Sequence, residues 1–191
     1  MKYFFFILSY LTTTLSFSQK SETFEYFKTI LNEHNMQFMM PDNYSEIAVK
    51  ENNDLAYYYA IKHDSLKMEI RYTYFSIKDA LETNKTRIGV QTDPNKMYIA
   101  LTSTNQLNLS GGRKNKVTRF APNAVQGEFN ADDGGSTFII LNSEFGKGYK
   151  NCVMVVLHKK NIVDAYVLFL FDDSEVYQNY SEESFYSLTF K

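Results

Sequence analysis

Two segments in the second half of the chain are apolar at nearly every position, and they constrain the fold more than any other feature. One runs from Cys152 to Leu157 and the other from Ala165 to Phe171, with a short polar connection at 159–161. A strand without a polar face is covered on both sides, whereas a strand with one face in water alternates. We therefore predict two antiparallel strands, at 151–158 and 163–171, in the centre of a sheet with packed layers on both faces.

A contrasting pattern occupies residues 66–74, where apolar side chains alternate with polar ones so that Lys67, Glu69 and Arg71 share one face. Such alternation is typical of a half-buried strand. With the strand-like residues before it, this segment predicts an antiparallel hairpin at 55–75, with its charged face in water and placed near an edge of the sheet or on an uncovered stretch. Further strands are predicted at 47–50, 117–121, 124–131 and 136–143, with a tight hairpin connection at 132–135.

Helix signals separate these strands. Ser21 and Ser76 are each placed to cap the first turn of a helix. Pro94 follows an aspartate, as at many helix starts, and Gly111 suits a helix end. The predicted helices lie at 21–35, 77–83, 94–110 and, as one or two short helices, within 174–188. We predict an α+β fold, a largely antiparallel β-sheet flanked by helices, in a single domain over residues 19–191.

The first eighteen residues have the pattern of a secretory signal peptide. Lys2 supplies a positive charge, an apolar stretch follows to about Leu15, and Ser16-Phe17-Ser18 places small residues before a cleavage point. The stretch is shorter than the roughly 20 apolar residues that a membrane-spanning helix needs. We predict cleavage after residue 18 and a periplasmic or extracellular location, with no membrane span after cleavage. The excess of lysine over arginine, 16 to 4, indicates an AT-rich, bacterial genome.

Composition limits the partners and the chemistry of the chain. The formal net charge is −2, so the protein lacks the positive field that would attract nucleic acid. We therefore predict no nucleic-acid binding. Cys152 is the only cysteine, which excludes an intramolecular disulfide. Because Cys152 begins an apolar strand, an inert core thiol is favoured over a nucleophile.

Motifs that carry catalysis or bind metals are absent from the sequence. It contains no G-x-S-x-G, H-E-x-x-H, C-x-x-C or phosphate-binding loop of the Walker type. No spacing places two of the three histidines, His34, His63 and His158, on one face of an element. Residues 145–150 contain glycine and lysine, but they join two strands and are predicted to form a plain turn. We predict no catalytic residue, no metal site and no cofactor.

Tyrosines are the strongest remaining signal for binding. Tyrosine combines a large contact area with a polar tip and is enriched at protein interfaces. Core packing beneath a helix is the alternative interpretation of the same side chains. The predicted contact surface consists of Tyr57, Tyr59, Tyr72 and Tyr74, with a polar rim of Arg113, Lys114 and Lys116.

A proline-led segment at Met40-Pro41 is followed by an early hairpin, a middle helix, several long strands and a closing Ser187-Leu188-Thr189-Phe190. This order, over about residues 38–190, resembles that of the Mog1/PsbP-like α/β sandwiches. That family includes exported bacterial proteins and small chaperone-like domains, and it has no common catalytic residues. The resemblance implies a non-catalytic domain that binds proteins or other ligands on its sheet or in a groove.

These observations predict an exported, non-catalytic binding module that contacts a protein partner through an aromatic sheet surface. Two alternatives stay open. An exported hydrolase would need His63 or His158 beside a carboxylate in a pocket, with shifted pKa values. A carrier of a small apolar molecule or a lipid would need an apolar cavity between the sheet and the helices.

Overall fold

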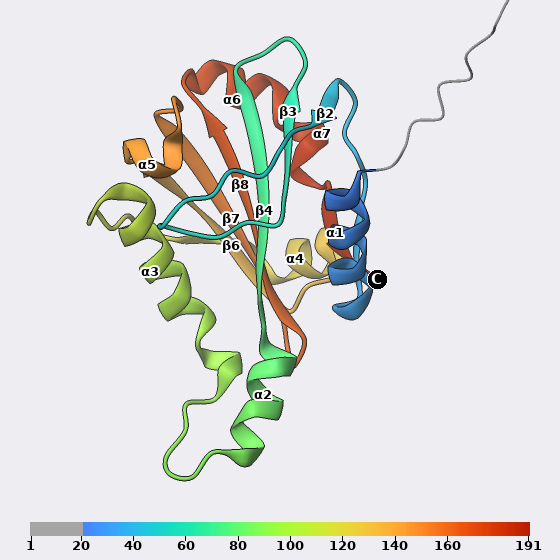
Figure 1. The fold of residues 1–191 in the computed structure, drawn as a ribbon, viewed down its shortest axis with the longest axis vertical. Coiled ribbons are helices and arrows are strands. Elements are labelled where there is room, and N and C mark those ends of the chain that lie inside the picture. Colours follow the sequence, from blue (N-terminus) through green and yellow to red (C-terminus); the bar gives the residue numbers. More distant parts are fainter. Residues whose placement is uncertain (1–20) are drawn as a thin grey trace, which may run out of the picture.

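A seven-stranded antiparallel sheet forms the centre of the computed structural model, which describes residues 21–191 (Figure 1). The predicted signal peptide lies outside the described residues. Along the sheet the strand order is β2-β3-β4-β8-β7-β6-β5. The strands are β2 (Tyr44–Glu46), β3 (Tyr59–His63), β4 (Met68–Ser76), β5 (Thr118–Arg119), β6 (Asp133–Ile140), β7 (Asn151–Lys159) and β8 (Val163–Phe171). The predicted α+β class, an antiparallel sheet flanked by helices, is confirmed.

The two continuously apolar segments are β7 and β8, and they occupy the middle of the sheet as predicted. β8 is fourth of the seven strands, and all of its residues are buried. The two strands pair antiparallel from Asn151 opposite Phe171 to Lys159 opposite Val163. Asn161 completes the turn between them with a φ of +62°, a conformation that asparagine adopts more readily than most residues.

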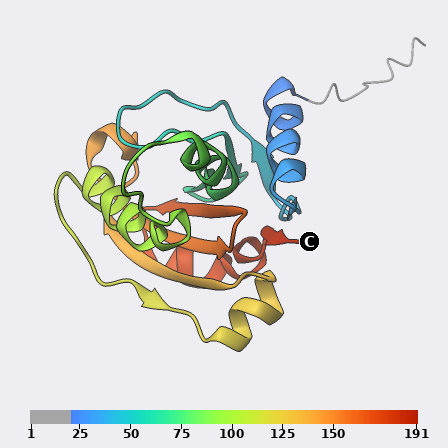
Figure 2. The ribbon, with the colours of Figure 1, turned by 90° about the horizontal axis from the view of Figure 1, so that it is seen from below.

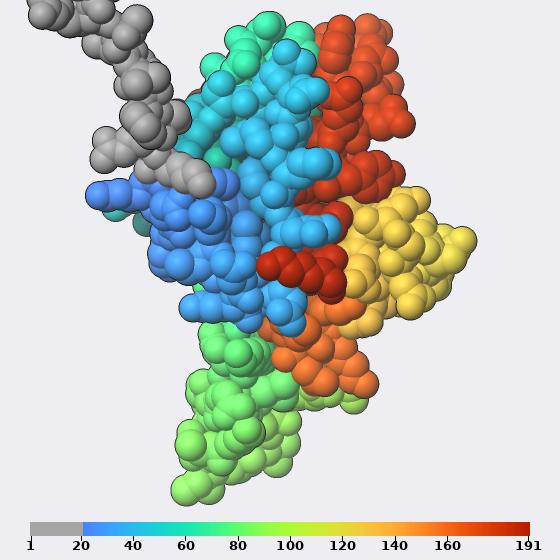
Figure 3. All heavy atoms as spheres, turned by 90° about the vertical axis from the view of Figure 1, so that its right-hand side faces the viewer, coloured from blue at the N-terminus to red at the C-terminus, as the bar shows by residue number. Residues whose placement is uncertain are grey.

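Helices cover both faces of the sheet (Figure 2), and a small two-stranded ribbon lies with the helices on one of them (Figure 3). One side, here called the α1 face, packs against the ribbon of β1 (Met36–Phe38) and β9 (Leu188–Phe190) and against four helices. These helices are α1 (Glu22–Glu33), α4 (Pro122–Phe129), α6 (Ser174–Tyr180) and α7 (Glu182–Phe185). The opposite side, the α3 face, packs against α3 (Tyr98–Ser110) and the short α5 (Ser143–Gly146). Both layers are required because β7 and β8 are apolar on both faces.

The helix starts predicted at Ser21 and Ser76 are confirmed, whereas the helix predicted from Pro94 begins later, at Tyr98. The Ser21 hydroxyl accepts a hydrogen bond from the Phe24 amide at the start of α1, and Ser76 caps α2 (Ile77–Thr86) in the same way. Pro94 begins a single 3₁₀ turn, η1 (Pro94–Lys96), and α3 follows at Tyr98. Gly111 ends α3 with a φ of +67°, as its position predicts.

Residues 124–131 were predicted as a strand, and the structure shows helix α4 there instead. Pro122 stands in the first turn, where its missing N–H is not needed, and Asn130 ends the helix with a φ of +50°. Val125 and Phe129 are four residues apart and both face the core, a spacing that suits a helix. The predicted tight turn at 132–135 is also wrong, because Asp133–Ile140 is strand β6.

The early hairpin is correct in its pairing and lies near the β2 edge of the sheet, but the face predicted to be in water is covered. β3 and β4 pair antiparallel, with Tyr59 opposite Tyr72. β4 also pairs along its whole length with β8, so it is an interior strand. The strand predicted at 47–50 lies instead at 44–46, and residues 47–58 form a loop. This loop and α5 contribute Tyr57 and Phe145, whose rings cover the Arg71 side chain on the face of β4 that was predicted to be in water.

Arg71 and Glu69 form a buried ion pair on the α3 face, with side-chain exposures of 1% and 5%. The Arg71 Nε donates to Glu69 Oε1 at 2.6 Å, and Nη1 donates to the Phe145 carbonyl oxygen at 2.6 Å. The guanidinium lies 4.9 Å from the centroid of the Tyr57 ring and 4.6 Å from that of Phe145. A buried charge is tolerated when it is paired, hydrogen-bonded and stacked in this manner.

We expect Glu69→Gln to lower the free energy of unfolding by about 3 kcal/mol or more, because it leaves the buried guanidinium without a countercharge. Urea unfolding followed by circular dichroism measures this change. The matched control is Lys67→Gln, which removes the exposed Lys67–Asp172 pair and is expected to change stability by less than about 1 kcal/mol. Equal losses in the two variants would contradict a special role for the buried pair.

Candidate functional site

Three of the four tyrosines predicted to form a contact surface are core residues, so that prediction requires correction. Tyr57, Tyr59 and Tyr72 are 4%, 0% and 1% exposed. The Phe27 ring of α1 stacks on Tyr59 with centroids 4.6 Å apart, and burial raises the pKa of the Tyr59 and Tyr72 hydroxyls. Tyr74 is half-buried. A side chain inside the core offers no area to a partner, and the alternative interpretation, packing beneath a helix, describes these residues correctly.

The predicted polar rim is exposed but lies elsewhere. Arg113, Lys114 and Lys116 are in the loop between α3 and β5, at the far end of the sheet (Figure 2). The Lys116 carbonyl accepts a hydrogen bond from Thr137 of β6. Since β8 and β7 separate β6 from β4, the rim and the tyrosine-bearing strands are about 14 Å apart at a spacing of about 4.8 Å per strand. The structure therefore does not bring these two predicted sets together.

A different part of the α1 face, on β6, carries two large apolar side chains that the described residues leave partly exposed. Phe138 and Ile140 are 42% and 47% exposed, although they lie in the middle and at the end of a strand. Beside them is an open groove of about 600 Å³, here called the edge groove. It is lined by Asn115, Lys116, Thr118, Ser136, Thr137, Phe138, Val153 and Tyr177. Lys116 is the one predicted site residue that reaches it.

The backbone of β6 next to this groove is only partly paired. β5 pairs with β6 at Gly135 and Ser136 alone. In an antiparallel ladder the N–H and C=O of every second residue point away from the same neighbour. The Gly134 carbonyl accepts a hydrogen bond from the Phe120 amide, and the Phe138 carbonyl accepts one from the Asn115 side chain. The backbone N–H and C=O groups of the even-numbered residues of β6 therefore point away from β7. The N–H and C=O of Ile140 therefore face outward, beyond the reach of β5.

Sequence reasoning missed Phe138 and Ile140 because five consecutive residues, 137–141, include only one polar side chain. In such a run either face reads as apolar, so the pattern does not show which one is exposed. The exposed side depends on where α4 and α6 end on the sheet and on the shortness of β5. No local signal in the sequence carries that information.

His158 is the one histidine with a carboxylate beside it, as the hydrolase alternative requires. Its Nδ1 lies 2.6 Å from Asp164 Oδ1, and burial raises the pKa of the Asp164 carboxyl. Both residues are buried, however, and the Tyr98 ring stacks on the imidazole at 4.7 Å. A general base must come within hydrogen-bonding distance of its substrate. The geometry supports a structural pair beneath Tyr98 more than a catalytic one.

The other two histidines have local roles. His34 Nδ1 lies 2.9 Å from the Ile30 carbonyl oxygen at the end of α1. His63 Nδ1 accepts the amide hydrogens of Ser65 and Leu66 in the β3–β4 turn. Within residues 21–191, no group of three or more histidine, cysteine, aspartate or glutamate side chains is arranged to hold a metal ion. Cys152 is fully buried, and burial raises the pKa of its thiol.

A cavity between α3 and the sheet bears on the carrier alternative. It measures about 160 Å³, and Arg119 and Asp133 form part of its wall. Sites for small organic ligands usually measure roughly 300–1,000 Å³ and are mostly apolar. This cavity is smaller than that range, and its size does not favour the carriage of a lipid.

Comparison of the chain with protein-family models, with curated proteins and with solved structures finds no match. The resemblance to the Mog1/PsbP-like sandwiches therefore stays a prediction. Over residues 21–191, none of the helices has the length and apolar character needed to cross a bilayer.

The loss of stability on side-chain truncation distinguishes core residues from residues of the candidate surface. We expect Tyr72→Ala to lower the free energy of unfolding by about 3–5 kcal/mol, because it leaves a cavity in a packed layer. Phe138→Ala, at an exposed position, is expected to cost less than about 1 kcal/mol. Chemical denaturation of the two variants beside the parent protein measures both values, and a loss at Phe138 as large as at Tyr72 would show that Phe138 belongs to the core.

Proposed function

We propose that the protein is an exported, non-catalytic binding module that takes up an extended segment of a protein partner at the edge groove. The observation that supports this most directly is the outer edge of β6, where open backbone groups lie next to two exposed apolar side chains. An extended peptide that adds to a sheet edge gains affinity from main-chain hydrogen bonds and specificity from alternate side-chain contacts. The groove offers both kinds of contact.

The shape of the groove defines how such a segment would lie. It would continue the sheet beyond the short β5 and the Asn115–Phe138 contact, opposite Ile140 at the end of β6. Its apolar side chains at alternate positions would pack beside Phe138 and Ile140, and each such cross-strand pair contributes about 0.2–1 kcal/mol. Val153 and Tyr177 form the inner wall of the groove and would contact the same side chains.

The basic residues next to the edge groove predict the charge of the partner segment. Residues 111–116 hold three basic side chains and no acidic one, and all six residues are exposed. Lys116 lines the groove itself. Complementary charge steers association and fixes the register of an interface. The partner segment is therefore expected to carry an acidic residue next to its apolar positions.

Site-specific photo-crosslinking in cells of the natural host tests this function. A photoreactive benzoylphenylalanine in place of Phe138 is expected to capture a discrete protein partner. The same group in place of Ile99, which is 53% exposed on α3, is the control and is expected to capture none. Ile140→Pro removes an outward N–H without breaking the β6–β7 ladder, so it is expected to abolish capture at position 138 while the folded circular dichroism spectrum is kept.

Three results would contradict the proposal. The first is the absence of any adduct at position 138. The second is a second copy of this chain as the sole adduct, since that would make the groove a dimer interface. The third is equal capture at positions 138 and 99, which would indicate non-specific collision.

A further inference from the structure

Four lysines from four separate segments of the chain line one cavity on the α3 face, away from the edge groove. The cavity measures about 650 Å³ and is here called the lysine cavity. Lys50 comes from the 47–58 loop, Lys62 from β3, Lys67 from the β3–β4 turn and Lys147 from the end of α5. The rest of its wall consists of Ile47, Ala48, Glu69, Gly148 and Tyr149.

The local charge of this cavity differs in sign from that of the whole chain, whose formal net charge is −2. Glu69 is the only carboxylate in the wall, and the ion pair with Arg71 neutralises it. Lys67 pairs with Asp172 at 2.6 Å, and Lys147 pairs with Glu144 at 3.3 Å. A concave site lined by one sign of charge attracts ligands of the opposite sign.

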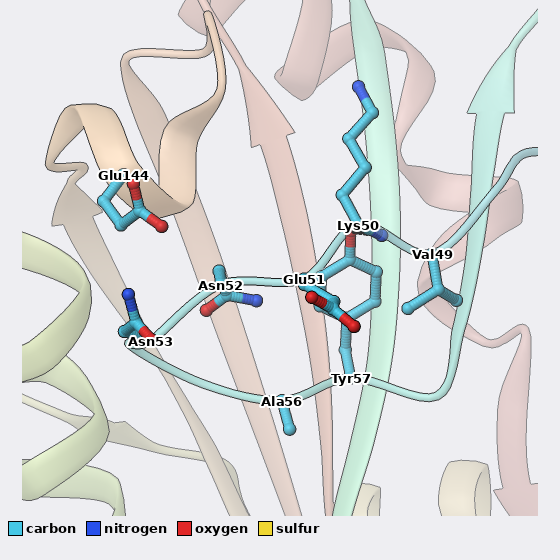
Figure 4. Close-up of a pocket in the computed structure, with 8 residues that line it drawn as sticks. All are labelled: Val49, Lys50, Glu51, Asn52, Asn53, Ala56, Tyr57 and Glu144. Carbon is cyan, nitrogen blue, oxygen red and sulfur yellow. Dashed lines mark hydrogen bonds between the residues drawn. The ribbon is translucent and has the colours of Figure 1, made fainter.

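The remaining two lysines have no such partner. Lys50 and Lys62 are exposed, and neither forms an ion pair with any residue in 21–191. Figure 4 shows the neighbouring cavity, which shares Lys50 and contains Glu51 and Glu144. In that view the Lys50 side chain extends away from both glutamates. Two ammonium groups at the lysine cavity are therefore available to an external anion.

Residues 145–150, predicted as a plain turn, connect α5 to β7 and also form part of the wall of this cavity. They place Lys147, Gly148 and the half-buried Tyr149 in its wall. Burial raises the pKa of Tyr149 to about 12, with a further contribution from the charge of Glu69. The neutral Tyr149 ring and Ile47 give the cavity an apolar wall beside its cationic groups. An organic molecule, and not only a bare ion, finds complementary contacts there.

We propose that the lysine cavity binds a small organic molecule that carries at least two negative charges, of which a phosphate monoester is the simplest example. Lysine ammonium groups are common donors to phosphate, which they recognise as point charges without demanding a planar geometry. The volume lies in the range of small-molecule sites. The organic part of the ligand would contact Tyr149 and Ile47, and its anionic group would lie between Lys50 and Lys62. This site is independent of the proposed partner groove on the opposite face.

Isothermal titration calorimetry with three probes tests the proposal on residues 19–191. The probes are phenyl phosphate, inorganic phosphate and phenol. Phenyl phosphate is expected to bind at one site per chain and more tightly than either of the other two. Lys50→Gln and Lys62→Gln are each expected to weaken binding about tenfold, which corresponds to one lost charge-assisted hydrogen bond. Added salt is expected to weaken it further.

The matched control is a double variant, Lys78→Gln with Lys160→Gln. It changes the net charge as much as the double variant of Lys50 and Lys62, and both of its lysines are exposed elsewhere. Its affinity for phenyl phosphate is expected to equal that of the parent. Circular dichroism of all variants checks the fold, which substitutions of exposed lysines leave intact.

Four outcomes would overturn the proposal. Absence of binding at about 1 mM phenyl phosphate would exclude a site of useful affinity. Equal affinity for inorganic phosphate would show an adventitious ion only. Equal affinity for phenol would remove the need for charge. Equal weakening in the control variant would show that the net charge of the protein, and not this cavity, attracts the ligand.

Discussion

The buried guanidinium of Arg71 is the constraint on which the α3 face depends. An unpaired charge in a protein interior destabilises the folded state by several kcal/mol, so every group around Arg71 has to be in place when the sheet closes. Glu69 supplies the countercharge, Phe145 supplies a carbonyl oxygen and a ring, and Tyr57 supplies the second ring. These contacts fix the 47–58 loop and the α5 turn over β4. The lysine cavity lies between those two segments, so its shape follows from the same interaction.

The opposite end of the sheet is built differently. There β5 supplies only two residues, and the loop before it contacts β6 through the Asn115 and Thr137 side chains. β6 consequently ends in a stretch with a covered face toward α3 and an open face and edge toward solvent. Charged and aromatic contacts therefore cover the sheet around β4, whereas, within residues 21–191, the end of β6 has an apolar edge with unpaired backbone groups.

The sequence predicted those elements whose signals are local. β7 and β8 were predictable because a strand covered on both faces leaves a continuous apolar run, and α1 because Ser21 caps it next in the chain. The covering of the charged face of β4 was not predictable in the same way. Its alternation identified two faces, but the groups that cover Arg71 come from residues 57 and 145, which no pattern near residue 71 reveals. The tyrosines were misjudged for the same reason, since the ring stacked on Tyr59 belongs to α1.

The exposed edge of β6 is unusual in one further respect. Natural proteins protect sheet edges with lysine, proline, bulges or a covering loop, because an open edge pairs with any available strand and promotes aggregation. Residues 137–140 carry no charge and no proline, and two of their four side chains are large, apolar and exposed. Full burial of such a side chain stabilises by about 1.5–3 kcal/mol, and the partial exposure of Phe138 and Ile140 forfeits part of that stabilisation at each position. Both penalties are removed when another strand occupies the edge, and that is the physical reason to look for the occupant there.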